Sequence, residues 1–324
     1  MIVGITGGAG LIGSHLTRQL IDAGHTVSVF DCFRSVIQPP STIHDANMNF
    51  RFTFLLKGAD ICRGITWDQE EVMSWVRKIN ADAIIHLAAM SLPNVSLKYP
   101  QETFNDFLIG TTNLLGAISS MDRKPKARFV FASSSTVYGD FETEPMPETG
   151  RTDPKDVYGG LKLSAEYLVK AYAKNFGIPY TIVRPSSVYG PTDNLNRIVD
   201  LFLTKAMNEE TICAENPART LDFTYVTDAA AAIAGLTVSE AAANRTFNVS
   251  RGRSRTVQEL IDIIRGRYPT VEVEVTQEQA HRSKRGALDV SAAKALGYSP
   301  KVDLEEGVKL TAQYMESTRM KYDI

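Results

Sequence analysis

Residues 2–14 read IVGITGGAGLIGS, an apolar run followed at once by a cluster of glycines. Gly8, Gly10 and Gly13 satisfy the pattern GxGxxG, and Gly7, Gly10 and Gly13 satisfy GxxGxxG. Glycine suits such a turn because a Cβ would obstruct a bound pyrophosphate and the packing of the following helix on the strand. The N–H groups at the start of that helix then face the phosphates. The stretch predicts a strand, a tight turn and a helix that hold a dinucleotide.

A carboxylate ends the next expected strand, 26–31. This residue, Asp31, follows Gly10 by 21 positions. A carboxylate there accepts hydrogen bonds from both ribose hydroxyls and repels a 2′-phosphate, so we expect NAD as the cofactor in preference to NADP. Arg34 lies close enough in the sequence to keep NADP open as the alternative.

Tyr158 and Lys162 are four residues apart at the start of an expected amphipathic helix, so they share one face of it. A free tyrosine has a pKa of about 10 and needs help to act as a base. A nearby ammonium and a positively charged nicotinamide both favour phenolate and lower this pKa. Ser134 is the hydroxyl expected to orient the substrate oxygen. The spacing alone is common on ordinary helix faces, but together with the glycine turn it predicts hydride chemistry at a carbinol.

Short β-rich runs alternate with helical patterns through the first two-thirds of the chain. The expected strands are 1–6, 26–31, 51–56, 83–87, 128–132 and 180–183. The expected helices are 11–23, 102–119 and 158–176. This alternation predicts an α/β fold of the Rossmann type, with a doubly wound parallel sheet covered on both faces. Residues 33–49 are polar with two prolines and are expected to form a long surface loop.

The regular pattern loosens after about residue 185. We expect residues 1–185 to form an NAD-binding domain and residues 186–324 a smaller, mixed α/β substrate-binding lobe. Residues 222–240 are apolar enough to pack back on the first domain.

Composition excludes several classes of function. The 324 residues carry a net charge of −2, which gives no electrostatic reason to expect nucleic acid or a membrane as partner. No apolar run is long enough to span a bilayer, and no signal peptide is visible. The three cysteines and five histidines show no zinc-site spacing, so no metal is expected. Sparse, unpaired cysteines suit a cytoplasmic location.

Several further motifs extend from the glycine turn to the C-terminal part of the chain. They are HLAA at 86–89, SSSTVYG at 133–139, YGGLK at 158–162, RPSSVYGP at 184–191, DFTYV at 222–226 and LGYSP at 296–300. With these motifs the chain resembles the NAD-dependent epimerase/dehydratase family of extended short-chain dehydrogenases/reductases, in the style of UDP-glucose 4-epimerases. The resemblance covers nearly the whole chain.

The resemblance implies a set of cofactor-binding residues. They are Gly7, Gly10, Leu11, Ile12 and Gly13 at the pyrophosphate, Asp31 at the adenosine ribose, Asp60 and Ile61 beside the adenine, Leu87, Ala88 and Ala89 under the cofactor, Asn105 as a support, Tyr158 and Lys162 at the nicotinamide ribose, and Pro185 at its amide. The catalytic residues that it implies are Ser134, Tyr158 and Lys162. It also implies a homodimer, because the expected helix from Tyr158 carries two apolar faces and its partner helix in the family belongs to a second subunit.

The sequence departs from the family at positions that bear on the reaction. Ser135 and Thr136 stand where the 4,6-dehydratases have acidic residues, which disfavours dehydration and decarboxylation. Ser187 replaces an expected asparagine, and leucine precedes Asp222 where an arginine often clamps a diphosphate. Ser135, Ser187, Arg219 and Arg282 are the expected substrate contacts.

The function expected from these features is epimerisation of a nucleotide sugar, at C4 of a UDP-hexose or a related sugar, through transient hydride abstraction to a keto intermediate. The alternatives are an NAD(P)-dependent reductase or dehydrogenase acting on a sugar or polyol derivative, and a non-enzymatic nucleotide-sensing module. The retained Ser134, Tyr158 and Lys162 argue against the last of these.

Overall fold

A computed structural model describes residues 1–34, 41–90, 93–276 and 283–322. Its centre is a seven-stranded sheet in the order β11-β6-β5-β4-β1-β2-β3, in which every neighbouring pair is parallel. The strands are β1 Ile2–Thr6, β2 Thr26–Asp31, β3 Asp60–Arg63, β4 Ala83–His86, β5 Arg128–Ala132, β6 Tyr180–Pro185 and β11 Arg245–Val249. The expected Rossmann class is confirmed.

The direction of strand order reverses at β1. From there the chain continues outward through β2 and β3, returns to β4 on the other side, and proceeds to β5 and β6. In such a sheet the crevice for a ligand lies outside the carboxyl ends of the strands at this switch point. The glycine turn follows β1, Leu87 follows β4 and Ser134 comes shortly after β5, so the topology brings all three to one edge.

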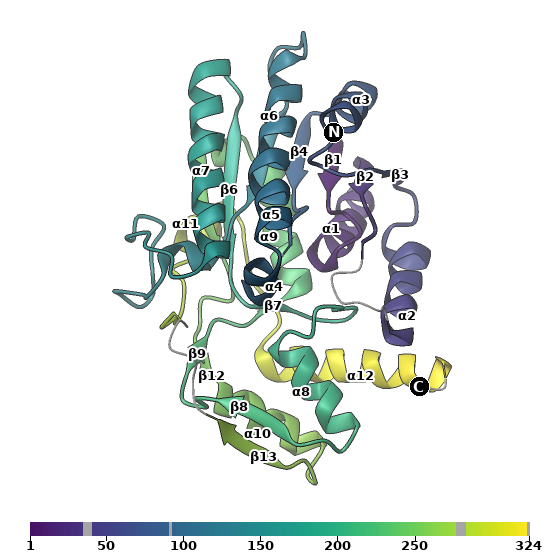
Figure 1. Ribbon diagram of the computed structural model, residues 1–324, viewed down its shortest axis with the longest axis vertical. Helices are drawn as coiled ribbons and strands as arrows, with labels where there is room; N and C mark the ends of the chain where they lie inside the picture. The colour runs from purple at the N-terminus through teal and green to yellow at the C-terminus, as the bar shows by residue number, and fades with distance from the viewer. Residues whose placement is uncertain (35–40, 91–92, 277–282, 323–324) are drawn as a thin grey trace.

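Helices cover both faces of the sheet (Figure 1). Helices α1 (Leu11–Asp22) and α9 (Val226–Val238) share one apolar core with inward side chains of β1 and β2. Helices α3 (Gln69–Ile79), α6 (Gly110–Ser120) and α7 (Val157–Phe176) share another core with side chains of β4 and β5. Strands buried on both faces explain why their sequences are nearly continuous apolar runs.

A separate apolar core lies below the sheet in Figure 1. It is built from α8 Ile198–Met207, β8 Ile212–Glu215, α10 Val257–Arg267, β13 Val273–Thr276 and α12 Leu304–Tyr322, with β8 and β13 paired in parallel. Two smaller sheets join the lobes: β7 (Val188–Tyr189) with β10 (Thr224–Tyr225), and β9 (Thr220–Leu221) with β12 (Arg255–Thr256). The short helix α11 is Ser291–Lys294.

The chain crosses between the two cores more than once. After the excursion through α8 and β8, α9 packs against α1 and β11 pairs with β6 at the edge of the main sheet. Helix α11 then packs against β11. The boundary at residue 185 stays a prediction, and the sheet includes residues well beyond it.

Two sequence-based expectations about local structure are wrong. Residues 51–56 are not a strand: α2 (Thr42–Phe50) continues into a π-helix at Arg51–Leu55, and the strand that extends the sheet is β3. Half of the expected loop at 33–49 is therefore helical, and this helix begins at Ser41, whose side chain accepts a hydrogen bond from His44 N at 3.1 Å. Tertiary contacts of the buried Arg51 favour the helix over the alternating strand pattern.

The expected helix 102–119 is interrupted. It consists of α5 (Pro100–Phe104), a π-helical turn at Asn105–Ile109, and α6, and it follows the short helix α4 (Pro93–Lys98). Within the described ranges, no helix combines the length and the apolar character needed to cross a membrane.

Candidate active site

A cavity of about 480 Å³ lies at the carboxyl edge of the sheet, and both lobes contribute to its wall. The glycine turn, the ends of β4, β5 and β6, and the start of α7 line it from the side of the sheet. Residues 193–195 and 197–199, together with Arg219, Leu221 and Phe223, line it from the other side. The strand topology therefore produces the crevice in which the predicted residues were expected to meet.

The glycine turn leaves no room for side chains. Gly7 has φ +70°, and a Cβ there would come within 2.6 Å of the Ala88 amide nitrogen. A Cβ on Gly13 would collide with the Gly7 carbonyl oxygen. Helix α1 begins at Leu11 without a side-chain cap, so the amides of its first turn remain for a ligand. The turn thus has the shape and polarity of a pyrophosphate cradle.

Asp31 stands beside this cradle at the end of β2. Its carboxylate accepts hydrogen bonds from Ala9 N at 2.9 Å and Phe33 N at 2.8 Å. Burial raises the pKa of Asp31, and these hydrogen bonds oppose the rise. Arg34, the residue that kept NADP open, also lines the cavity and pairs with Glu102 at 2.8 Å.

Ser134 and Tyr158 both line the cavity. Tyr158 is the second residue of α7, a helix that starts where the Asp156 side chain caps Gly159 N at 2.6 Å. Burial raises the pKa of Tyr158; Arg197 opposes this most strongly, followed by the hydrogen bond from Ser134. The sequence predicted that Lys162 lowers this pKa, which stays a prediction, and it did not predict a part for Arg197.

Lys162 lies one helical turn after Tyr158 and is buried. Its ammonium donates to Ala132 O at 2.6 Å and lies 4.7 Å from the centre of the Phe107 ring. Burial lowers the pKa of Lys162 to about 7, while Glu166 and Asp106 oppose the shift. Near neutral pH the Lys162 side chain is therefore expected in both its protonated and its neutral form.

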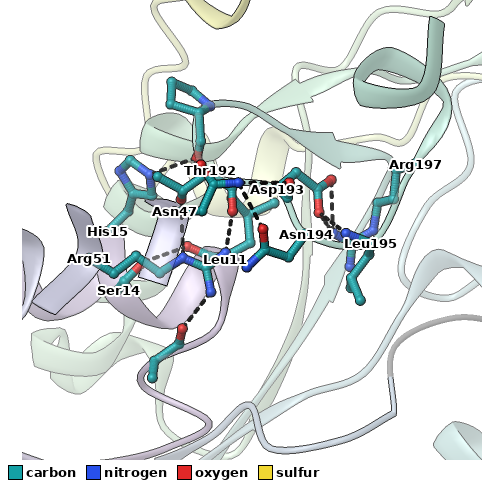
Figure 2. A network of polar contacts seen from close by, with 12 residues as sticks. Leu11, Ser14, His15, Asn47, Arg51, Thr192, Asp193, Asn194, Leu195 and Arg197 are labelled. Atoms are coloured by element: carbon teal, nitrogen blue, oxygen red, sulfur yellow. Dashed lines mark hydrogen bonds and ion pairs between the residues drawn. The ribbon is translucent and has the colours of Figure 1, made fainter. Parts of the chain in front are cut away.

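Three arginines from the second part of the chain line the cavity: Arg197, Arg219 and Arg285. Arg197 is held by the Asp193 carboxylate, with Nη1 at 3.1 and 3.2 Å from its two oxygens (Figure 2). The cluster gives this wall the chemistry of a phosphate or carboxylate site.

Comparison with known proteins supplies the family. Residues 5–311 match the family described as GDP-mannose 4,6 dehydratase, a span that includes nearly the whole chain. The chain belongs to this family. The resemblance to NAD-dependent epimerases/dehydratases of the extended short-chain dehydrogenase/reductase type is confirmed, and the protein is an enzyme of that type.

Individual members of the family catalyse different reactions. Thermotoga maritima UDP-glucose 4-epimerase, solved with UDP-glucose, is 28% identical, with coverage of 98% of this chain and 99% of that one and a TM-score of 0.86. Bacillus cereus UDP-glucuronic acid 4-epimerase, solved with UDP-glucuronic acid and NAD, is 25% identical with the same coverage and a TM-score of 0.87. Danio rerio UDP-glucuronic acid decarboxylase 1 is 29% identical over 96% of this chain and 71% of its own length.

Most residues that the sequence singled out for this family's site line the one cavity. They are Gly7, Gly10, Leu11, Ile12, Gly13, Asp31, Leu87, Ala88, Ala89, Ser134, Tyr158, Lys162, Pro185, Ser187 and Arg219. Arg282 lies outside the described residues.

Asp60 and Ile61 are placed elsewhere. Both are exposed at the start of β3, and the Asp60 carboxylate accepts from Ser28 Oγ at 3.1 Å and from Lys78 Nζ at 3.3 Å. The cavity is lined instead by residues 64–66, which follow the carboxyl end of the same strand. The predicted contact of Asp60 and Ile61 with the adenine stays a prediction, and the cavity lining favours the residues that follow the same strand.

Ser135 and Asn105 also fall outside the cavity lining. Ser135 is buried, with no hydrogen-bond partner for its hydroxyl among the described residues. Asn105 accepts from Gln101 Nε2 at 3.3 Å, and the neighbouring Asp106 lines the cavity in its place. The π-helical turn at Asn105–Ile109 shifts the register of the side chains, which a uniform helical pattern does not anticipate.

Sequence reasoning missed several charged residues that line the cavity, among them Asp106, Arg197 and Arg285. Burial raises the pKa of Asp106 to about 6. Arg285 stands in a basic stretch of the sequence, 281–285, and lines the cavity. Arg197 follows a polar loop after two prolines, and nothing in its local sequence marked it.

Proposed function

We propose that this enzyme is an NAD-dependent 4-epimerase of a nucleotide sugar, acting on a UDP-hexose or a related sugar. The observation that carries the proposal is that Ser134 and Tyr158 line the same cavity as the glycine cradle. The fit of the cradle to a pyrophosphate and the NAD found with the Bacillus cereus relative support the cofactor.

The residues of this chain provide the acid–base part of the reaction. Tyr158 takes the proton from the sugar hydroxyl and later returns it, while Ser134 holds the same oxygen in line with the phenol. When the Lys162 amine is protonated, its positive charge stabilises the deprotonated phenol of Tyr158. NAD, when bound, supplies a reversible acceptor for the hydride on the carbinol carbon. The keto sugar then turns over in the cavity, and the hydroxyl forms again with the opposite configuration.

The substrate class follows from charge. Arg197, Arg219 and Arg285 give a wall suited to the two phosphates of a nucleoside diphosphate, and two relatives were solved with UDP sugars.

Residues after the catalytic serine favour epimerisation over elimination. Ser135 is buried away from the cavity, and Thr136 donates to Ser134 Oγ at 3.0 Å. Neither is a carboxylate that could move a proton at a neighbouring carbon. Dehydration and decarboxylation, which relatives perform, lack their acid or base at these positions.

The test is an assay of the purified enzyme with UDP-glucose, UDP-glucuronate and free sugar acids. The epimerase predicts a mixture of C4 epimers, cofactor that copurifies, and no accumulation of NADH at its absorbance band. The runner-up, a reductase or dehydrogenase acting on a sugar or polyol derivative, predicts a stoichiometric change at that band. A net change in NADH without an epimeric product would replace the first proposal by the second.

We further propose a homodimer that acts in the cytoplasm. Large apolar side chains are exposed along α4, α5, the π-helical turn and α7: Leu97, Phe104, Ile109 and Tyr167. A second copy of the chain would cover these apolar side chains. The cytoplasmic location is supported by the three cysteines, which are free thiols and fit a reducing compartment. Light scattering after size exclusion tests the dimer; a mass near that of one chain, 35.7 kDa, would contradict it.

A further inference from the structure

Arg51 is a buried cation that joins the glycine turn to the second lobe. Its side chain is 4% exposed, and Nη1 donates to the carbonyl of Ala9 at 2.6 Å. On the other side of the guanidinium, Nε donates to Thr192 Oγ1 at 3.2 Å and Nη2 donates to the Thr192 carbonyl. One planar group therefore bonds to two segments that are far apart in the sequence (Figure 2).

Asn47 makes a second connection of the same kind, one helical turn before Arg51. Its amide donates to Asn194 Oδ1 at 2.7 Å and to the Asp193 carbonyl at 3.3 Å. Its own oxygen accepts from the hydroxyl of Tyr314 on α12 at 2.8 Å. The i, i+4 spacing puts both side chains on one face of α2 and the following turn. The loop at 191–195 is thus held from two consecutive helical turns.

The loop continues directly to Arg197, which lines the cavity. The Asp193 carboxylate accepts from Leu195 N at 3.1 Å and binds Arg197, as described above. Arg197 lines the cavity and is the charge that most opposes the raised pKa of Tyr158. A continuous series of contacts therefore runs from Ala9, inside the cradle, through Arg51 and the loop to the neighbourhood of the catalytic phenol.

The conformation of the loop requires such external support. Thr192 has φ +71° and Asn196 has φ +50°, which are unfavourable for residues other than glycine, particularly for a β-branched one. Burying a guanidinium is also costly unless its N–H groups are satisfied. Burial lowers the pKa of Arg51 to about 10, so it stays charged at neutral pH and its hydrogen bonds are of the strong, charge-assisted kind.

We propose that Arg51, with Asn47, is a positioning pair that couples occupation of the dinucleotide cradle to the placement of Arg197 in the cavity. The inference rests on the proposed function, because it takes the cradle to bind NAD. When the cradle is filled, Ala9 is fixed, and Arg51 transmits this order to Thr192, Asp193 and Arg197. The enzyme would then hold its substrate-side arginine in place only when the cofactor is present.

Hydrogen exchange read by mass spectrometry tests this coupling in the full chain, with and without NAD. In the wild type we expect NAD to slow amide exchange in residues 8–14 and also in residues 190–197. In the second segment the expected effect is about tenfold, which is the factor that one charge-assisted hydrogen bond contributes. In Arg51→Lys, NAD should still slow exchange in 8–14 but change 190–197 by less than about twofold, because lysine lacks the planar fork. Asn47→Leu, which keeps Arg51, should give an intermediate result and serves as the second variant if Arg51→Lys does not fold.

Arg128→Lys is the matched control. Arg128 is equally buried, at 6% exposed, and donates to the Thr237 carbonyl at 3.1 Å, away from the cavity. We expect this variant to lose stability but to keep the NAD response of both segments. This separates a positioning role from a general loss of packing.

The outcomes are distinguishable. If NAD slows exchange in neither segment of the wild type, the assignment of the cradle to a dinucleotide is wrong, and the proposed coupling is wrong as well. If NAD protects 8–14 but not 190–197 in the wild type, or protects 190–197 equally in Arg51→Lys, the cofactor assignment stands and the coupling is wrong.

Discussion

The Glu166 carboxylate and the Arg184 guanidinium form a buried, two-point ion pair between α7 and β6. Arg184 Nε lies 2.9 Å from Glu166 Oε1, and Nη2 lies 2.7 Å from Oε2; the side chains are 4% and 1% exposed. Glu166 is two helical turns after Tyr158, and Arg184 directly precedes Pro185, which lines the cavity. The pair therefore fixes the helix that carries Tyr158 relative to the strand that ends at Pro185.

Removing one partner of this pair should be strongly destabilising. In Glu166→Gln the guanidinium stays buried without its countercharge, which costs about 3–5 kcal/mol in comparable sites. Urea unfolding measures the loss. The exposed Arg151, which pairs with Glu142 and Asp153, is the control: Arg151→Met should change stability by less than about 1 kcal/mol. Equal losses in the two variants would contradict the structural role given to Glu166.

Tyr158→Phe should abolish turnover while NAD remains bound. The variant keeps the ring and its edge contact with Phe107 but loses the proton carrier, so kcat should fall by about 10²–10⁴-fold. Tyr138→Phe is the matched control, since its buried hydroxyl bonds to Asn248 and Arg184 and lies outside the set of cavity-lining residues described here. It should lower the melting temperature and leave kcat within about threefold. Activity retained in Tyr158→Phe would refute the proposed acid–base role.

Asp31→Asn should weaken NAD binding and relax discrimination against NADP. The change removes the negative charge that repels a 2′-phosphate and a charged acceptor for the ribose, so the Kd for NAD should rise about tenfold. Isothermal titration with both cofactors measures it. Because Arg34 is paired with Glu102, the double variant Asp31→Asn/Glu102→Gln should bind NADP more tightly than Asp31→Asn alone. Glu102→Gln by itself should keep the preference for NAD.

Asp106→Asn should stabilise the protein at neutral pH. Burial raises the pKa of Asp106 from 3.8 to about 6, so between these values the folded state binds more protons than the unfolded state. The contribution of Asp106 to stability therefore falls as the pH rises from 4 to 6, and stays low above 6. Relative to the wild type, Asp106→Asn should gain about 2 kcal/mol between pH 4 and pH 7. Urea unfolding at both pH values measures this, and parallel changes in wild type and variant would contradict it.

The sequence was sufficient to predict those parts of the site that depend on local pattern. The glycine turn needs a fixed spacing after a strand, and Tyr158 and Lys162 need one helical turn between them. Both requirements are visible within a few residues. The parallel, doubly wound class of the sheet followed from the alternation of strands and helices.

Long-range contacts account for what the sequence did not predict. The segment 51–56 alternates as a strand would, but the bonds of Arg51 to Ala9 and Thr192 favour a helical turn. Asp106 and not Asn105 enters the cavity because a π-helical turn shifts the register there. Arg197 owes its place to Asp193 and to a loop with unfavourable backbone angles, neither of which has a local signature.

The return of the chain as β11 bears on how the lobes can be separated. This strand runs beside β6 in parallel register, from Arg245 opposite Thr181 to Val249 opposite Pro185. A fragment that ended at residue 185 would lack β11 and α9. The hydrogen-bonding edge of β6 and the surface of α1 that packs against α9 would then be exposed. The two halves are therefore interlocked: neither can be excised as an autonomous module, and any opening of the cavity must flex several crossing segments at once.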